Sequence, residues 1–184
     1  IISYCFAAYF LWTGVLMSTM KTLHLIRHAK SSWKDASLAD IDRPLAPRGI
    51  RACAVMAPEI AKAGCDFSNV FTSPAARARE TIERIAGSLK KVSFTWTVAE
   101  KLYTFNAHDL LEFCRDDLPA NIEQAVIVGH NPAFHDFCNR VGDTTIEKLP
   151  TCAYARLELD ADSWTDIGLR RMQLTAFLTP KMFR

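Results

Sequence analysis

The sequence predicts a single-domain three-layer α/β/α sandwich with a mostly parallel central sheet. Short apolar runs typical of buried strands alternate along the chain with segments whose apolar residues recur at helical spacing. Strands separated by helices favour parallel pairing, because a parallel connection needs a crossover that a helix supplies. The chain has 184 residues, of which 49% are hydrophobic, which is enough for one sizeable core and short for two.

Six segments are expected to form strands. The first four are apolar or rich in β-branched and aromatic residues, as in strands that are buried on at least one face. In the last two, apolar and polar residues alternate around a turn at 160–166, which predicts a closing antiparallel pair. The expected strands cover residues 21–26, 69–72, 92–98, 125–128, 153–159 and 172–178.

Four segments between these strands are expected to form helices. Each carries one apolar stripe, as in a helix that packs one face against a sheet. Pro58 lies inside the first of them and should kink or interrupt it, because proline lacks an N–H donor and crowds the preceding turn. The expected helices cover residues 50–61, 78–89, 110–118 and 134–141.

Composition excludes several classes of function. The chain has 22 Lys and Arg against 20 Asp and Glu, and the net charge of +2 is too small for an electrostatic footprint on nucleic acid or an anionic membrane. Its 6 cysteines include no CxxC pair and no regular spacing, so neither a zinc site nor a disulfide framework is indicated. Scattered core thiols favour a reducing compartment, and we expect a cytoplasmic protein.

Residues 1–19 form an uncharged apolar leader that we exclude from the fold. Their length is close to the ~20 apolar residues that span a bilayer, but they lack the basic region and cleavage site of a secretory signal. Met17 and Met20 offer internal starts. We therefore expect the folded domain to cover residues 20–184, and membrane attachment only if the leader is a real anchor.

Polar side chains follow three of the expected strands at the point where each strand ends. Arg27 and His28 follow the first, Ser73 and Arg77 lie just after the second, and His130 follows the run 125–128. Because the carboxyl ends of parallel strands form the ligand-binding rim of an open sheet, these side chains should converge.

Ser73 and Asn131 are candidate helix N-caps, since each precedes a proline that would stand at the first helical position. The free N–H groups of such helix ends favour anions. Together with two planar arginine forks, they predict a pocket for a phosphoryl group.

In such a pocket His28 is the candidate nucleophile. Arg27 and Arg77 should lower the pKa of His28, which keeps its imidazole neutral and able to attack phosphorus near neutral pH. The arginines would stabilise the charge on the phosphoryl oxygens, and His130 would donate a hydrogen bond to them. Water would then release phosphate, so this predicted mechanism needs neither a metal nor a cofactor.

Four motifs resemble those of the histidine phosphatase superfamily, whose fold is phosphoglycerate mutase-like, and in particular the small SixA-type phosphohistidine phosphatases. They are LxLIRHA at 23–29, DRPLxxRG at 42–49, TSPxxRAxxT at 72–81 and VGHNP at 128–132. The resemblance covers about residues 20–184. It implies His28 as phosphoryl acceptor, with Arg27, Arg77 and His130 as its catalytic and phosphate-binding partners, and no metal.

No carboxylate can be assigned from sequence as the acid that protonates a leaving group; Glu100 is the candidate to test. The imidazole that leaves phosphohistidine has a conjugate acid with a pKa of about 6.5, so its departure needs little help from an acid. An alkoxide leaving group needs much more acid assistance. Short connections also suggest a pocket open enough for a protein substrate. Both points, with the resemblance, indicate a phosphorylated protein as partner, for example a histidine-containing phosphotransfer domain.

Other readings stay open. The same pocket would serve a phosphatase for small phosphate esters, or a catalytically weak phosphate-binding regulatory module; a mutase is disfavoured because it needs a closed site. His24 is expected to be a packed or hydrogen-bonded core residue. Lys30, Arg43 and Arg48 could rim the site or belong to the general surface.

Overall fold

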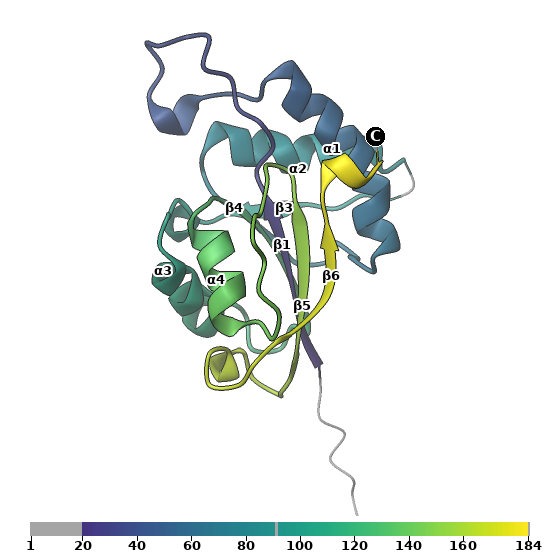
Figure 1. Ribbon diagram of the computed structural model, residues 1–184, viewed down its shortest axis with the longest axis vertical. Helices are drawn as coiled ribbons and strands as arrows, with labels where there is room; N and C mark the ends of the chain where they lie inside the picture. The colour runs from purple at the N-terminus through teal and green to yellow at the C-terminus, as the bar shows by residue number, and fades with distance from the viewer. Residues whose placement is uncertain (1–19, 91, 184) are drawn as a thin grey trace, which may run out of the picture.

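The computed structural model describes residues 20–90 and 92–183, which form one mixed six-stranded sheet with helices on both faces (Figure 1). The leader 1–19 lies outside the described residues. The predicted α/β class is confirmed. The strands are β1 (Met20–Arg27), β2 (Val70–Thr72), β3 (Trp96–Val98), β4 (Gln124–Gly129), β5 (Tyr154–Asp160) and β6 (Gln173–Leu178).

The strands lie in the order β3-β2-β4-β1-β5-β6. β1 pairs in parallel with β4, β4 with β2, and β2 with β3, whereas β5 is antiparallel to both β1 and β6. The predicted closing antiparallel pair is therefore present. The three strands whose ends carry the candidate site residues, β2, β4 and β1, are direct neighbours at the centre of the sheet.

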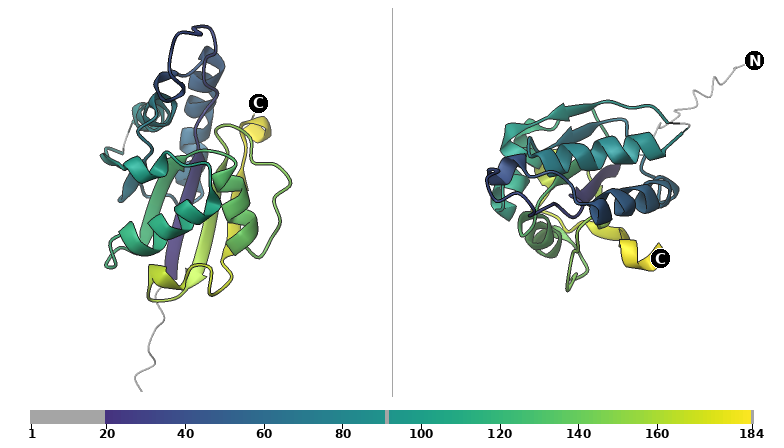
Figure 2. Two further views of the ribbon diagram at one scale, coloured as in Figure 1. Left: turned by 90° about the vertical axis from the view of Figure 1, so that its left-hand side faces the viewer. Right: turned by 90° about the horizontal axis from the view of Figure 1, so that it is seen from above.

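Each helix pair covers one face of the sheet. Leu23 and Leu25 of β1 pack with α3 and α4, while Ile26 packs with α1 and α2, as the two-residue period of a strand requires. In the left view of Figure 2, α3 and α4 lie in front of the sheet. The helices are α1 (Pro47–Lys62), α2 (Ala76–Ser88), α3 (Ala107–Glu112) and α4 (Ala133–Val141).

Three elements differ from the sequence expectation. Of the helix expected at 110–118, α3 covers the residues up to Glu112, and Phe113–Asp117 continue it as a π-helix. The strand expected at 92–98 is limited to Trp96–Val98. The interruption expected at Pro58 is wrong, because α1 runs through it without a break. Pro58 and Ala54 are both exposed, so the carbonyl group that loses its partner at this proline lies on the solvent side of the helix.

Among the described residues, no helix is both long and apolar enough to cross a membrane.

Candidate active site

The carboxyl ends of β1, β2 and β4 bring the predicted site residues together. The rings of His28 and His130 lie 5.1 Å apart between their centroids. Gly129 at the end of β4 leaves room for Phe134 of α4, because a Cβ atom there would stand 2.7 Å from the Phe134 ring. The connection 28–46 rises from the end of β1 at this edge of the sheet (Figure 1).

His28 is held in one tautomer. Its Nδ1 lies 2.7 Å from the carbonyl oxygen of Ala29, which can only accept, so Nδ1 carries the proton. The lone pair of the neutral ring is then on Nε2, which has no hydrogen-bond partner among the described residues. A neutral imidazole with an unshared Nε2 lone pair is a competent nucleophile.

The pKa of His28 is lowered from 6.5 to about 4. Burial is the main cause, and the positive charges of Arg77, Arg27 and Arg43 add to it; the hydrogen bond to Ala29 opposes the shift. The direction is the one expected from sequence, although the sequence argument invoked the arginines and burial has the larger effect. His28 is therefore neutral at physiological pH.

Arg77 lies in the first turn of α2 with only 3% of its surface exposed. Its Nη1 donates to the carbonyl oxygen of Asp40 at 2.5 Å, and its Nη2 donates to the Oδ2 atom of the same residue at 2.8 Å. Arg43 donates to the other carboxylate oxygen at 2.7 Å, and the Tyr103 hydroxyl donates to Oδ2 at 2.8 Å. Asp40 thus accepts hydrogen bonds from the same N–H groups of Arg77 that an incoming anion would need.

Asp40 is an anion at neutral pH. Burial raises its pKa, but the hydrogen bonds from Tyr103 and Arg77 and the charges of Arg77 and Arg43 outweigh burial and leave the pKa below its usual value. Its side chain is 47% exposed, whereas Arg77 beneath it is 3% exposed, so Asp40 separates Arg77 from solvent. Sequence reasoning missed Asp40, because no local pattern places it opposite a helix that begins 36 residues later, at Ala76.

His130 is buried among polar and aromatic neighbours. Its Nε2 lies 2.7 Å from the hydroxyl oxygen of Ser73, while its buried Nδ1 has no partner among the described residues. Tyr103 meets the His130 ring edge-on at 5.5 Å and Phe105 lies at 5.3 Å. Burial, followed by His28 and Arg77, lowers the pKa of His130 to about 3, so this ring is also neutral.

Arg27 is tied to the segment after α4. Its Nη1 donates to the carbonyl oxygen of Leu149 at 2.6 Å, and Asn131 donates to the same oxygen at 3.1 Å. The Nε of Arg27 is buried without a partner, and burial lowers the pKa of the guanidinium. Its charge nevertheless reaches His28, whose pKa it lowers.

The two N-cap predictions are wrong. The N-caps of α2 and α4 are Ala75 and Pro132, and neither makes a side-chain capping bond. Ser73 instead lies next to His130, and Asn131 donates to Leu149. Both side chains are therefore engaged in contacts around the site, one residue or more before the helix begins.

The remaining candidates are placed differently. Glu100 is exposed in the turn η2 (Glu100–Leu102), whereas Tyr103, just after that turn, donates to Asp40. Arg43 is 8% exposed, lies 3.3 Å over the ring of Trp33 and belongs to the site. Lys30 and Arg48 line a separate cavity.

The site is also more covered than its short connections suggested. His28, Arg77 and His130 expose only 9%, 3% and 1% of their surfaces. Among the described residues, no three His, Cys, Asp or Glu side chains are grouped so that they could hold a metal ion.

The chain is similar to known proteins in sequence and in fold. Residues 23–111 match the sequence profile of the histidine phosphatase superfamily (branch 1). The chain is 29% identical over 166 residues to an uncharacterised protein of Mycobacterium tuberculosis, a match that spans 85% of this chain and all of that protein.

Solved structures share the fold. A candidate phosphohistidine phosphatase SixA from Nakamurella multipartitia superposes with a TM-score of 0.74 at 22% identity, over 88% of this chain and 96% of that one. The protein histidine phosphatase SixA complexed with tungstate gives 0.72 at 18% identity, over 89% and 99%. These likenesses establish the architecture.

Proposed function

We propose that this chain, which belongs to the histidine phosphatase superfamily and is a phosphatase with a histidine mechanism, removes the phosphoryl group from phosphohistidine on a protein. The observation that carries the proposal is His28, a neutral imidazole with its Nδ1 proton committed to Ala29 and its Nε2 unshared, beside Arg77 and Arg27. The finer SixA-type assignment rests on the same residues together with the shared fold.

In the first step Nε2 of His28 attacks phosphorus, a P–N bond forms to the enzyme, and the P–N bond to the substrate imidazole breaks. The leaving imidazole takes up a proton from solvent water. In the second step water attacks the phosphoryl-His28, and inorganic phosphate leaves with regeneration of the neutral ring. The charge on the phosphoryl oxygens is stabilised by Arg27 and Arg77, and His130 supplies a hydrogen bond.

The carboxylate of Asp40 marks where the phosphoryl oxygens bind. It already satisfies two requirements of that position, a negative charge and contact with the Nη2 of Arg77. Because Asp40 is 47% exposed, it can be displaced toward solvent while Arg77 stays in place. Substrate binding in this scheme exchanges one anion for another on the same guanidinium.

The preference for phosphohistidine follows from the proton supply. Among the described residues, the carboxylate that contacts the predicted cluster is Asp40, and its lowered pKa makes it a poor acid. An imidazole leaving group, whose conjugate acid has a pKa of about 6.5, departs without strong acid assistance, whereas an alkoxide does not. This favours a phosphoramidate over a phosphate ester, and a phosphorylated protein such as a histidine-containing phosphotransfer domain as the partner.

We also propose a cytoplasmic location. It is supported by the free thiols of the described cysteines, all of them buried: Cys53, Cys65, Cys114, Cys138 and Cys152.

The test compares phosphate release from a phosphohistidine-bearing protein and from a simple alkyl phosphate, with chelator present. The proteins are wild type, His28→Ala, and His108→Ala as a control at an exposed histidine. We expect rapid release from phosphohistidine that requires His28 and not His108. Faster release from the ester would indicate a hidden proton donor and a metabolic substrate, and no release from either would favour the phosphate-binding module.

A further inference from the structure

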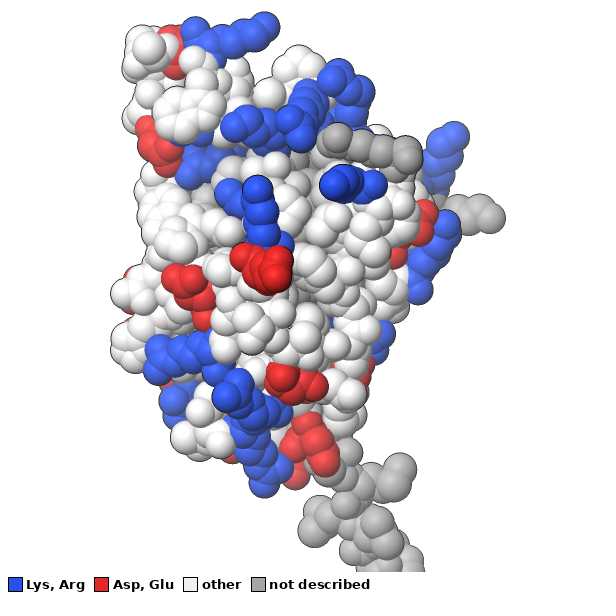
Figure 3. Space-filling model, viewed as in Figure 1, with Lys and Arg blue, Asp and Glu red and all other residues white. Residues whose placement is uncertain are grey.

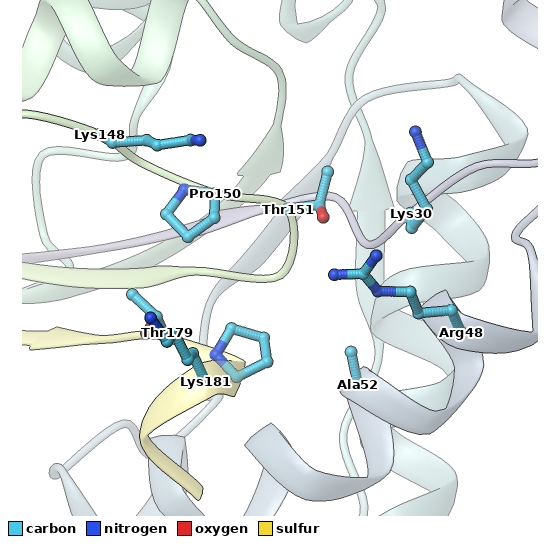
Figure 4. A pocket seen from close by; sticks show the side chains of 9 residues that line it. Lys30, Arg48, Ala52, Lys148, Pro150, Thr151, Thr179 and Lys181 are labelled. Carbon is cyan, nitrogen blue, oxygen red and sulfur yellow. The ribbon is translucent and has the colours of Figure 1, made fainter. Parts of the chain in front are cut away.

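A cavity lies beside the catalytic cluster of Arg27, His28, Arg77 and His130, and none of these four residues lines it. Its volume is about 350 Å³, and it is bordered by the segment after β1, the first turns of α1, the segment before β5 and the chain after β6 (Figure 4). Its lining residues are Lys30, Arg48, Ala52, Lys148, Pro150, Thr151, Thr179, Pro180 and Lys181.

The charged residues that line this cavity are all positive. Lys30, Arg48, Lys148 and Lys181 line it and no acidic residue does. In the part of the chain that the structure describes, none of these four side chains forms an ion pair. Figure 3 shows basic side chains gathered on the upper part of the face that holds α1 and the C-terminal turn. Four unneutralised cations around one hollow create a positive potential that an anion would relieve.

Two of the cations, Lys30 and Arg48, stand on segments that pack directly against each other. The backbone of Lys30 accepts from the N–H of Ala46 at 2.8 Å, and a Cβ atom on Gly49 would lie 2.4 Å from the same carbonyl oxygen, so α1 begins directly against Lys30. In Figure 4 the guanidinium of Arg48 points from α1 toward Thr151, and Lys148 extends over Pro150. The backbone that carries Lys30 and Arg48 is therefore fixed by packing, while the four cationic side chains themselves are exposed and free to adjust to a ligand.

Local backbone groups add to the attraction for anions. The N-cap of α1 is Ala46, whose side chain cannot accept a hydrogen bond from the first turn. The positive end of this helix, which runs for 16 residues, lies beside the cavity with Arg48 in its first turn. The hydroxyl groups of Thr151 and Thr179 provide neutral donors on the opposite wall.

The cavity is distinct from the catalytic cluster, although one segment borders both. Leu149 accepts from Arg27, and the N–H of Cys152 donates to the carbonyl oxygens of Arg27 and His28, each at 3.1 Å. Pro150 and Thr151 lie between these two contacts and form a wall of the cavity. Its position thus differs from that of the phosphoryl group proposed above, which faces Arg77.

We propose that this cavity binds a small polyanion that carries two or more phosphate groups. Its volume falls within the range of about 300–1,000 Å³ that small-molecule sites occupy. Its cations come from four separate stretches of chain around one hollow, which suits a compact ligand with several charges better than a single extended acidic segment. The hollow has polar donors on its walls and no carboxylate to oppose the ligand.

The test is an NMR titration with inorganic pyrophosphate at about 0.15 M salt, where non-specific surface attraction is screened. All proteins carry His28→Ala, so that the chemistry proposed above cannot consume the probe. The cavity variant adds Arg48→Ala and Lys148→Ala. The control adds Arg79→Ala and Arg84→Ala, which remove the same charge from exposed positions of α2. The amide signals of Thr151 and Thr179 report the cavity, and that of Gly129 reports the catalytic cluster.

We expect saturable shifts at Thr151 and Thr179, at least tenfold weaker binding in the cavity variant, and unchanged binding in the control. Inorganic phosphate should bind the cavity more weakly than pyrophosphate. Equal affinity in the cavity variant, or shifts confined to Gly129, would overturn the proposal. So would a hexa-aspartate peptide that binds in an Arg48- and Lys148-dependent way while pyrophosphate does not, since that result would assign the cavity to an acidic protein segment. The inference does not rest on the proposed phosphatase substrate.

Discussion

Two histidines, one in the middle of β1 and one just after its carboxyl end, share the same physical state and differ in what surrounds them. His24 lies within the strand and is 0% exposed; His28 follows its carboxyl end and is 9% exposed. Burial is the main reason that the pKa of each is lowered to about 4. At neutral pH both are uncharged imidazoles, so neither burial nor the pKa separates a structural histidine from a reactive one.

Hydrogen bonding separates them. Both ring nitrogens of His24 have partners, Tyr154 at 2.7 Å and Gln124 at 3.1 Å, so its lone pair is already used. This confirms the expectation of a hydrogen-bonded core histidine. His28 has one committed nitrogen and one unshared nitrogen, and the charges of three arginines act on it. The hydrogen bonds of the ring nitrogens, and not burial or the pKa, therefore distinguish the proposed nucleophile His28 from the core histidine His24.

The largest expected effect is on turnover after His28→Ala. Removing the attacking nitrogen should lower phosphate release from phosphohistidine by at least about 10³-fold and abolish the phosphoenzyme. His24→Phe, the matched change at the histidine within β1, should retain turnover within about twofold. Phosphate release and phosphoenzyme labelling measure both. A phosphoenzyme that persists in His28→Ala would break the comparison.

Arg77→Ala should lower turnover by about 10²–10³-fold, because the variant loses the buried guanidinium that faces the developing charge on the phosphoryl group. Arg79→Ala serves as the control, since this side chain is exposed on the same helix. Steady-state kinetics are compared with thermal unfolding of each variant. Normal turnover in Arg77→Ala would remove this residue from the site.

His24→Phe should lower the free energy of unfolding by about 1–3 kcal/mol at pH 7, because Tyr154 and Gln124 lose a buried partner. The folded protein holds His24 neutral, so between pH 6.5 and about 4 the unfolded chain binds more protons and wild-type stability falls as the pH falls. The pKa shift of His24 accounts for up to about 3 kcal/mol of this loss.

Urea unfolding at pH 7 and pH 5 measures this difference. His24→Phe should lose less stability than wild type over that interval, because one of the groups that drives the loss is gone. An identical loss of unfolding free energy in both proteins would contradict the lowered pKa of His24 in the folded state.

The smallest effect is expected at Asp40. Replacing its carboxylate with the amide in Asp40→Asn removes a competing negative charge from Arg77, so inorganic phosphate should inhibit the variant about threefold to tenfold more strongly than wild type. Asp42→Asn, an exposed change in the same turn, is the control. Weaker inhibition in Asp40→Asn would mean that Asp40 holds Arg77 in place more than it competes with the anion.

The sequence alone determined the alternation of strands and helices and the three junctions that carry Arg27, His28, Arg77 and His130. Both are local properties: periodicity fixes which face of an element is buried, and the carboxyl ends of neighbouring parallel strands must meet at one edge. The continuous apolar run 125–128 therefore predicted a buried strand, and His130 after it was predicted to lie on the rim.

Only the tertiary structure decided what those side chains contact. Asp40 and Tyr103 reach Arg77 and His130 from segments far away in sequence, and no periodicity encodes such contacts. For the same reason Ser73 and Asn131 do not cap helices but contact His130 and Leu149. Lys30 and Arg48 likewise line a cavity together with Lys148 and Lys181. Local sequence sets which residues end each element, whereas the packing of distant elements sets which of their charges are paired, covered or left free for a ligand.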